Sequence, residues 1–308
     1  MKIEKVEIKG LFGKKDICWE LNPQVNVLVG ANGSGKSTIL SLLYDMLLTK
    51  SLRNNIDLFD SSKIYFSDSS VRIFDSISPN ELSQFENNIS SDLRVLLQIV
   101  SIKSVLSLNE VNSLDNENKL NIKVILGKDT DKLYIDLIEA NLTNSNANHI
   151  IQKSNQEKTN ALDMEIRETI YEFNKIKTDE LIERLLSSFN LFFNQIGKQV
   201  SYENNELVYT DIDLQKKLNY SHLSSGERQL IYILLRVVLS NADKNKTAII
   251  LMDEPEISLH LDWQEHFIKQ LTILNPDAQF IIVTHSPALI MNGWNDVYTD
   301  MEEITTWL

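Results

Sequence analysis

Residues 30–37 read Gly-Ala-Asn-Gly-Ser-Gly-Lys-Ser and decide the fold of this chain, because they fit the pattern G-x-x-x-x-G-K-[ST]. The apolar run at residues 25–29 predicts a buried strand before them, and residues 37–48 predict a helix after them. Three of the nine glycines of the chain lie in this stretch, so backbone freedom is concentrated where an anion has to be enclosed. The sequence therefore predicts a P-loop, a phosphate-binding turn between a strand and a helix.

Each group in this loop suits phosphate. The glycines let successive backbone N–H groups turn toward phosphate oxygens, and the helix N-terminus adds the positive end of its dipole. Lys36, expected to lie in a solvent-facing loop, is placed to reach the terminal phosphates, and the hydroxyl of Ser37 can bind Mg²⁺. The predicted nucleotide-binding residues are Asn32, Gly33, Ser34, Gly35, Lys36, Ser37 and Thr38.

Composition indicates a soluble globular protein. Apolar residues make up 43% of the 308 residues, and no stretch approaches the about 20 apolar residues of a membrane span. The chain begins with an alternating strand rather than a signal peptide, and its single cysteine, Cys18, permits no internal disulfide. We therefore expect a cytoplasmic protein, or one held peripherally by a partner.

The chain is acidic, with a net charge of −13, and residues 251–308 hold ten Asp or Glu against one Lys. Such a surface repels the phosphate backbone of a nucleic acid. Any role on DNA is therefore expected to use other surfaces or another chain.

Two short strands are expected before the P-loop strand. Residues 2–9 alternate in polarity and place Ile3, Val6 or Ile8 against a core, and residues 16–21 predict the second strand. Residues 51–220 carry no catalytic motif and are expected to form an insertion. Its predicted parts are a helix at 92–108, a strand pair at 119–125 and 132–138, an exposed Asn-rich loop at 141–160, and one or two amphipathic helices at 163–193.

Motifs return after residue 220. Ser224, Ser225 and Gly226 precede an apolar helix, which makes them a second helix N-terminus able to bind an anion. Taken alone, they and Glu227 favour the simpler interpretation of a helix cap that has an acid in its first turn.

The apolar strand predicted at 247–252 runs into Asp253 and Glu254. Acids at the carboxyl end of a buried strand can serve Mg²⁺ and a hydrolytic water, so we expect Asp253 to hold the metal and Glu254 to polarise the water. A turn at 256–260 leads into a helix at 262–274, and a further buried strand at 279–284 ends at His285.

In this order, the segments at 30–38, 223–229, 249–254, 256–260 and His285 resemble the Walker A, signature, Walker B, D-loop and H-switch of ABC-type ATPases. The sequence at 253–260, Asp-Glu-Pro-Glu-Ile-Ser-Leu-His, resembles that of one branch of the family. This branch contains the chromosome-maintenance (SMC), RecF-like and OLD ATPases and the small ATPases of anti-phage Septu and retron systems. The resemblance implies an α/β P-loop NTPase fold, an ABC-type head with an antiparallel β lobe and a mixed α/β insertion. The implied domains are 1–50 and 221–308 for the head and 51–220 for the insertion.

The resemblance also implies ATP, rather than GTP, and Mg²⁺ as the bound groups. In that family two heads sandwich two ATP molecules, so Ser225 and Gly226, with Ser224 and Glu227 beside them, would contact the γ-phosphate held by the opposite chain. His285 would sense the γ-phosphate from the same chain. A glutamine completes the Mg²⁺ site in the family; Gln84 and Gln98 are the alternatives here, and Gln84 is favoured.

The function that the resemblance implies is an ATPase that forms a homodimer or higher oligomer and regulates an effector in phage defence. The chain ends 23 residues after His285, so a nuclease domain such as OLD proteins carry is expected on another polypeptide, for example an HNH nuclease, with a reverse transcriptase or its DNA product as a further partner. The alternatives are a DNA-repair or chromosome head that binds DNA directly, and a transporter subunit, which the long insertion disfavours.

Overall fold

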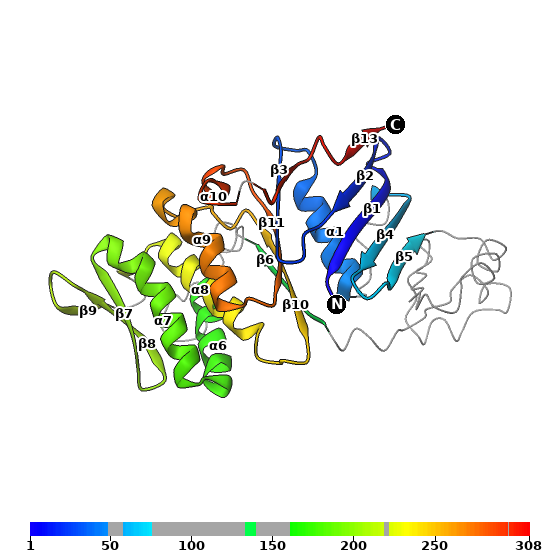
Figure 1. Cartoon of the computed structure of the whole chain (residues 1–308). Helices are drawn as coiled ribbons and strands as arrows, with labels where there is room; N and C mark the ends of the chain where they lie inside the picture. The colour runs from blue at the N-terminus through cyan, green and yellow to red at the C-terminus, as the bar shows by residue number, and fades with distance from the viewer. Residues whose placement is uncertain (49–57, 76–132, 140–160, 219–221, 295) are drawn as a thin grey trace, which may run out of the picture.

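The computed structural model describes residues 1–48, 58–75, 133–139, 161–218, 222–294 and 296–308. Within these ranges one helix lies between two sheets, and a lobe of helices covers the other face of the second sheet (Figure 1). Some predictions lie outside the described residues: the helix at 92–108, the strand at 119–125, the loop at 141–160, and Gln84 with its alternative Gln98.

The first sheet is antiparallel, with the strand order β13-β2-β1-β4-β5. A strict period of two would place Ile3 and Val6 on opposite faces of β1, yet Ile3, Val6 and Ile8 are all buried in one core. The register of β1 against β4 shifts between Ile3 and Lys5, and this irregularity brings the three side chains to the same side. The strands are β1 Ile3–Leu11, β2 Lys15–Glu20, β4 Ser61–Phe66, β5 Val71–Asp75 and β13 Thr305–Trp307.

The second sheet is parallel, with the order β12-β3-β11-β10-β6, and its central strands are apolar at almost every position. Both faces are covered, as in most parallel sheets. Ile249 and Leu251 face the core shared with the first sheet, whereas Ile250 and Met252 face the helical lobe. The strands are β3 Val25–Val29, β6 Leu133–Glu139, β10 Thr247–Asp253, β11 Gln279–Val283 and β12 Tyr298–Asp300.

Two buried amides tie this sheet to the segments around it. The side chain of Gln279 accepts a hydrogen bond from the Ile3 N–H at 2.7 Å and donates to the Ile3 carbonyl at 2.7 Å. The side chain of Asn26 accepts from the Asn22 N–H at 2.5 Å and donates to the Asn22 carbonyl at 2.9 Å. Neither amide is therefore left without a partner in the core.

Within the described residues, the helices predicted at 37–48, at 163–193, after Gly226 and at 262–274 are present, whereas the short helix at 288–291 was not predicted. The predicted helical region at 163–193 divides at Thr178, whose hydroxyl accepts from the Leu181 N–H at 3.2 Å and caps the second helix. The helices are α1 Lys36–Leu48, α6 Ala161–Ile176, α7 Asp179–Phe193, η3 Asn194–Ile196, α8 Ser225–Leu239, α9 Leu261–Leu274 and α10 Ala288–Met291.

A third, three-stranded antiparallel sheet packs on α7 and was not predicted. Its hairpin turns at Asn204 and Asn205, whose φ angles are 51° and 68°, a conformation that asparagine tolerates better than most residues. This Asn pair lies between two short stretches with apolar residues two apart, Val200 and Tyr202 before it and Leu207 and Tyr209 after it, and that is the signal that could have found the hairpin. The strands are β7 Lys198–Glu203, β8 Glu206–Asp211 and β9 Lys216–Leu218.

The strand predicted at 132–138 is present as β6, but the structure places it in the second sheet. It runs parallel to β10 from the Leu133–Thr247 pair to the Glu139–Asp253 pair. Likewise, β4 and β5 belong to the first sheet. The division of the chain at 51–220 stays a prediction, while these three strands from that range contribute to the sheets of the head.

No described helix combines the length with the apolar composition that crossing a bilayer requires.

Candidate functional site

Three neighbouring strands of the second sheet end at one edge. β3 leads into the P-loop, β10 ends at Asp253, and β11 ends just before Thr284. Because the carboxyl ends of parallel strands meet at the same edge, segments far apart in sequence come together there. A pocket of about 450 Å³ opens at this edge, lined by Phe12, Asn32, Gly33, Gly35, Lys36, Ser37, Thr38, Glu254 and His285.

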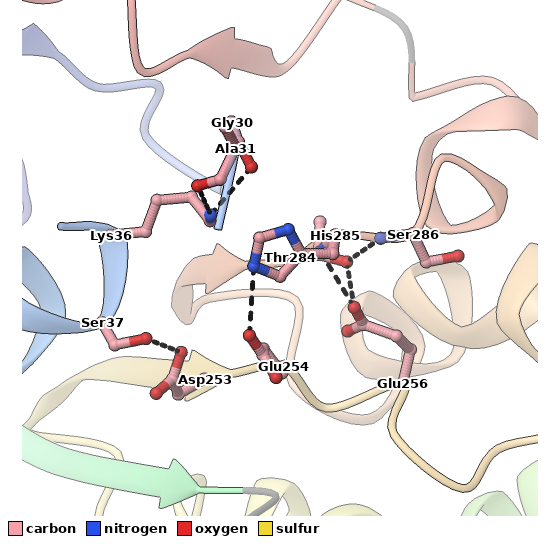
Figure 2. Close-up of polar contacts among 10 residues, drawn as sticks. All are labelled: Gly30, Ala31, Lys36, Ser37, Asp253, Glu254, Glu256, Thr284, His285 and Ser286. Atoms are coloured by element: carbon pink, nitrogen blue, oxygen red, sulfur yellow. Dashed lines mark hydrogen bonds and ion pairs between the residues drawn. The ribbon is translucent and has the colours of Figure 1, made fainter. Parts of the chain in front are cut away.

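Lys36 lies folded against its own loop. Its Nζ donates to the carbonyls of Gly30 and Ala31 at 2.9 and 3.0 Å, and the residue is 4% exposed, so the expectation of a solvent-facing side chain was wrong (Figure 2). Burial lowers the pKa of Lys36, while the nearby carboxylates of Glu254 and Asp253 act in the opposite direction. The ammonium is thus held at the floor of the pocket by acceptors that a phosphate can replace.

Ser37 and Asp253 meet across the site. The Ser37 hydroxyl donates to Oδ1 of Asp253 at 2.9 Å (Figure 2). Burial, followed by the like charge of Glu254, raises the pKa of Asp253. A carboxylate in that setting is stabilised by a cation, which makes these two oxygens a suitable pair for Mg²⁺.

Glu254 and His285 face each other at the wall of the pocket. Oε1 of Glu254 lies 3.2 Å from Nε2 of His285, and both side chains are partly exposed (Figure 2). Glu254 has a φ of +48°, which a non-glycine residue rarely adopts, and its N–H donates to the Val283 carbonyl at 2.8 Å. The backbone thus departs from strand geometry at the residue whose side chain turns into the pocket.

The signature residues lie elsewhere on the same chain: Ser224, Ser225, Gly226 and Glu227 do not line this pocket. Ser224 caps α8 by accepting from the Glu227 N–H at 3.2 Å, and Glu227 accepts in return from the Ser224 N–H at 2.9 Å. Glu227 also binds Lys198 at 2.7 Å and is buried, so its carboxylate serves the helix end and this ion pair. Ser224 and Ser225 are exposed.

Phe12 and Lys15, in and after the turn between β1 and β2, were missed. Phe12 lines the pocket and offers an aromatic face on which a planar base can stack. Lys15 is buried, and its Nζ donates to the Ser34 carbonyl. An ideal Cβ on Gly35 would lie 2.9 Å from the Phe12 ring, so the turn packs directly on the P-loop. No sequence pattern signals this contact, because it joins two separate segments.

A buried carboxylate lies behind His285. Glu256 is 8% exposed, and its Oε1 accepts from the Thr284 hydroxyl at 2.5 Å and from the His285 N–H at 3.0 Å (Figure 2). Burial raises the pKa of Glu256 above its ordinary value of 4.5. The sequence placed Glu256 in the D-loop by resemblance but predicted no contact for it.

The raised pKa makes the thermal stability of the protein depend on pH. The folded state binds the Glu256 proton more tightly than the unfolded state, so stability falls as pH rises from 4.5 through the folded pKa. Glu256→Gln keeps the acceptor oxygen and removes the charge. We expect the Tm of the variant, relative to wild type, to rise across that window in scanning calorimetry. Glu265→Gln, an exposed acid on α9, is the control; a pH-independent Tm difference would contradict the prediction.

A strand, a P-loop and a helix, with an acidic pair at the end of a parallel strand of the same sheet, define the class of P-loop nucleoside triphosphatases. The chain belongs to the family described as "AAA domain, putative AbiEii toxin, Type IV TA system", which matches residues 25–292.

Among curated proteins, the chain is similar to "Retron Vc95 probable ATPase" of Vibrio cholerae serotype O1 biovar El Tor, at 26% identity, covering 86% of this chain and 66% of that protein. "Retron Ec83 probable ATPase" of Escherichia coli is 22% identical, and the match covers 93% of this chain and 69% of that protein. A Clostridium botulinum "DNA replication and repair protein RecF" is 24% identical, with 81% and 70% covered. The "SMC head domain from Thermotoga maritima" aligns with a TM-score of 0.49 at 13% identity, covering 100% of this chain and 98% of that one.

These names confirm the predicted resemblance to the branch of ATPases that includes RecF and the retron ATPases. The chain spans about two thirds of the length of these curated relatives.

Proposed function

We propose that the protein binds ATP with Mg²⁺ in the P-loop pocket, hydrolyses it between two facing copies of the chain, and thereby controls a bound effector protein in bacterial phage defence. The observation that carries this proposal is the meeting of Glu254 and His285 beside the Ser37–Asp253 pair at the mouth of the P-loop. A base, a polar partner for it, and a cation site then surround one position where a terminal phosphate can lie.

In this proposal each described group has one task. Lys36 and the P-loop N–H groups bind the phosphates, and Ser37 and Asp253 would hold Mg²⁺, which supplies positive charge against the triphosphate when bound. Glu254 accepts the proton of the attacking water, and His285, whose Nε2 lies 3.2 Å from Oε1 of Glu254, orients that carboxylate and senses the γ-phosphate. Gln84 stays the favoured further metal contact.

The signature turn supports a dimer. Ser224 and Ser225 are exposed residues at the N-terminus of α8, a helix of 15 residues, and do not line the pocket of their own chain. The positive end of a helix dipole attracts phosphate. We infer that these residues close the pocket of a second copy over its γ-phosphate.

We expect Ser225→Arg to abolish ATP-dependent association of the heads and to lower turnover at least about 10-fold, because it places bulk against the phosphate while leaving the pocket of its own chain intact. Light scattering with and without ATP, in a background where hydrolysis is blocked, measures the association. Ser187→Arg, at an exposed serine on α7, is the matched control. Full turnover by a monomer would contradict the sandwich.

Similarity to ATPases named for retrons supports the proposal of a partner system. We propose that the effector is a nuclease on another polypeptide, for example an HNH nuclease, with a reverse transcriptase or its DNA product in the same assembly, all in the cytoplasm. The similarity to RecF favours a second candidate, a repair head that binds DNA directly. The net charge of −13 favours contact with nucleic acid through a partner.

Mass spectrometry of a native pull-down distinguishes the two candidates. Recovery of a nuclease supports the defence role, whereas hydrolysis that DNA stimulates in the isolated protein supports repair.

A further inference from the structure

The contacts of Glu256 form a link between two loops of the head. Its Oε1 binds the side chain of Thr284 and the backbone N–H of His285, so one oxygen fixes the main chain at the residue that enters the pocket. Its Oε2 is buried and has no hydrogen-bond partner among the described residues. Keeping a carboxylate in such a place is unfavourable on stability grounds alone, which points to a role in positioning.

The turn that carries Glu256 also contacts α8, the helix that begins in the signature segment. The side-chain amide of Gln229 in α8 donates to the Pro255 carbonyl at 3.0 Å. An ideal Cβ on Gly226 would lie only 2.0 Å from the Ser258 carbonyl oxygen, so the first turn of α8 rests directly on this backbone. Glu256 therefore lies between two residues that contact α8.

A second connection joins the same turn to the loop after β11. The Ser286 hydroxyl donates to the side chain of Gln264 at 2.5 Å, and the Gln264 amide donates to the Leu259 carbonyl at 3.0 Å. The Ser286 N–H also donates to the Thr284 hydroxyl at 2.8 Å. The loop at 284–286 is thus held to the D-loop turn by side chains on both of its flanks.

We propose that Glu256 is a positioning residue that couples the signature turn to His285. A displacement of the first turn of α8 moves the backbone at Pro255 and Ser258, and the Glu256 carboxylate transmits that displacement to the main chain of His285. His285 then meets Glu254 correctly only when the signature turn is in place. The positioning of His285 stands on these contacts alone, whereas coupling to a second nucleotide rests on the proposed function.

The first test measures kcat and the ATP dissociation constant of Glu256→Ala and Glu256→Gln. We expect Glu256→Ala to lower kcat about 10- to 100-fold with less than about threefold change in the dissociation constant, because it leaves the phosphate-binding loop untouched. Glu256→Gln keeps the acceptor oxygen and is expected to stay within about threefold of wild type. Glu265→Ala, an exposed acid on α9, is the control. An equal loss in the alanine and glutamine variants would overturn the proposal.

A double-mutant cycle separates positioning from general damage to the fold. If Glu256 acts through His285, adding Glu256→Ala to His285→Ala should lower kcat by less than about twofold further. Thr284→Val, which removes one of the two donors to Glu256, should show the same pattern with a smaller single effect, and it gives the same answer if Glu256→Ala folds poorly. If the double variant lowers kcat by the product of the two single effects, the proposal is overturned.

The dependence of wild-type turnover on ATP concentration tests the coupling separately. Two coupled sites give a Hill coefficient above 1 and at most 2, and Glu256→Ala should reduce it to about 1. A Hill coefficient of 1 for the wild-type protein would overturn the coupling between two sites. The double-mutant cycle would then still test whether Glu256 positions His285. If two wild-type heads do not associate more strongly with ATP than without it, the proposed sandwich is refuted instead.

Discussion

Glu254→Gln should reduce ATP hydrolysis by about 10² or more while ATP still binds. The substitution keeps the shape of the side chain and its reach to Nε2 of His285, 3.2 Å away, but removes the base. The positive φ of the residue is a property of the backbone that glutamine tolerates no worse than glutamate. Phosphate release under saturating ATP measures the rate, and calorimetry measures binding.

The same variant should accumulate the ATP-bound state. Association of two heads, followed by light scattering, is then expected to be stronger with ATP than without it. Glu265→Gln, which lies on the exposed side of α9, should hydrolyse ATP at the wild-type rate. If Glu254→Gln hydrolyses ATP at the wild-type rate, Glu254 is not the base, and a neighbouring group has to accept the proton of the water.

Lys36→Ala is expected to weaken ATP binding at least about 10²-fold, since each charge-assisted hydrogen bond to a phosphate contributes about 1.5–3 kcal/mol. The structure refines the reason. The ammonium is already held by the carbonyls of Gly30 and Ala31, so the Lys36 side chain loses little conformational freedom when phosphate replaces those acceptors. Calorimetry with ATP measures the affinity.

Because Lys36 is buried, this variant needs a measure of folding as well. We expect a folded protein, since the residues that pack the core around α1 are apolar and unchanged. Lys14→Ala, at an exposed lysine before β2, is the matched control and should bind ATP normally. Unchanged affinity in folded Lys36→Ala would show that the pocket is not the nucleotide site.

The parts of the fold that sequence predicts are those that short-range chemistry defines. The strand before the P-loop, the helix after it and the cap at Ser224 each depend on residues within one or two turns. β6 shows the limit. Its pattern predicts a strand, but its neighbour β10 pairs Thr247 with Leu133, and no local signal carries a partner so distant in sequence.

The site divides in the same way. The P-loop, Glu254 and His285 follow from motif and resemblance, and the structure brings them to one pocket. Phe12, Lys15 and the Thr284–Glu256 contact depend on which strands become neighbours, so they emerge only from the fold. The roles of the site residues stay predictions that the variants above test.

The central strands of the second sheet are almost uniformly apolar, so their hydrophobic pattern alone does not fix the register between neighbouring strands. In a strand that faces water on one side, a slip by one residue exposes the core face, but β11 is apolar toward both sides and a slip changes little in burial. A polar group with a fixed partner distinguishes one alignment from the next, because a slip would leave it without that partner. Gln279, bonded to both the N–H and the carbonyl of Ile3, supplies that distinction at the start of the strand. An amide at one end of β11 thus contributes to fixing which residue reaches the P-loop pocket at the other end.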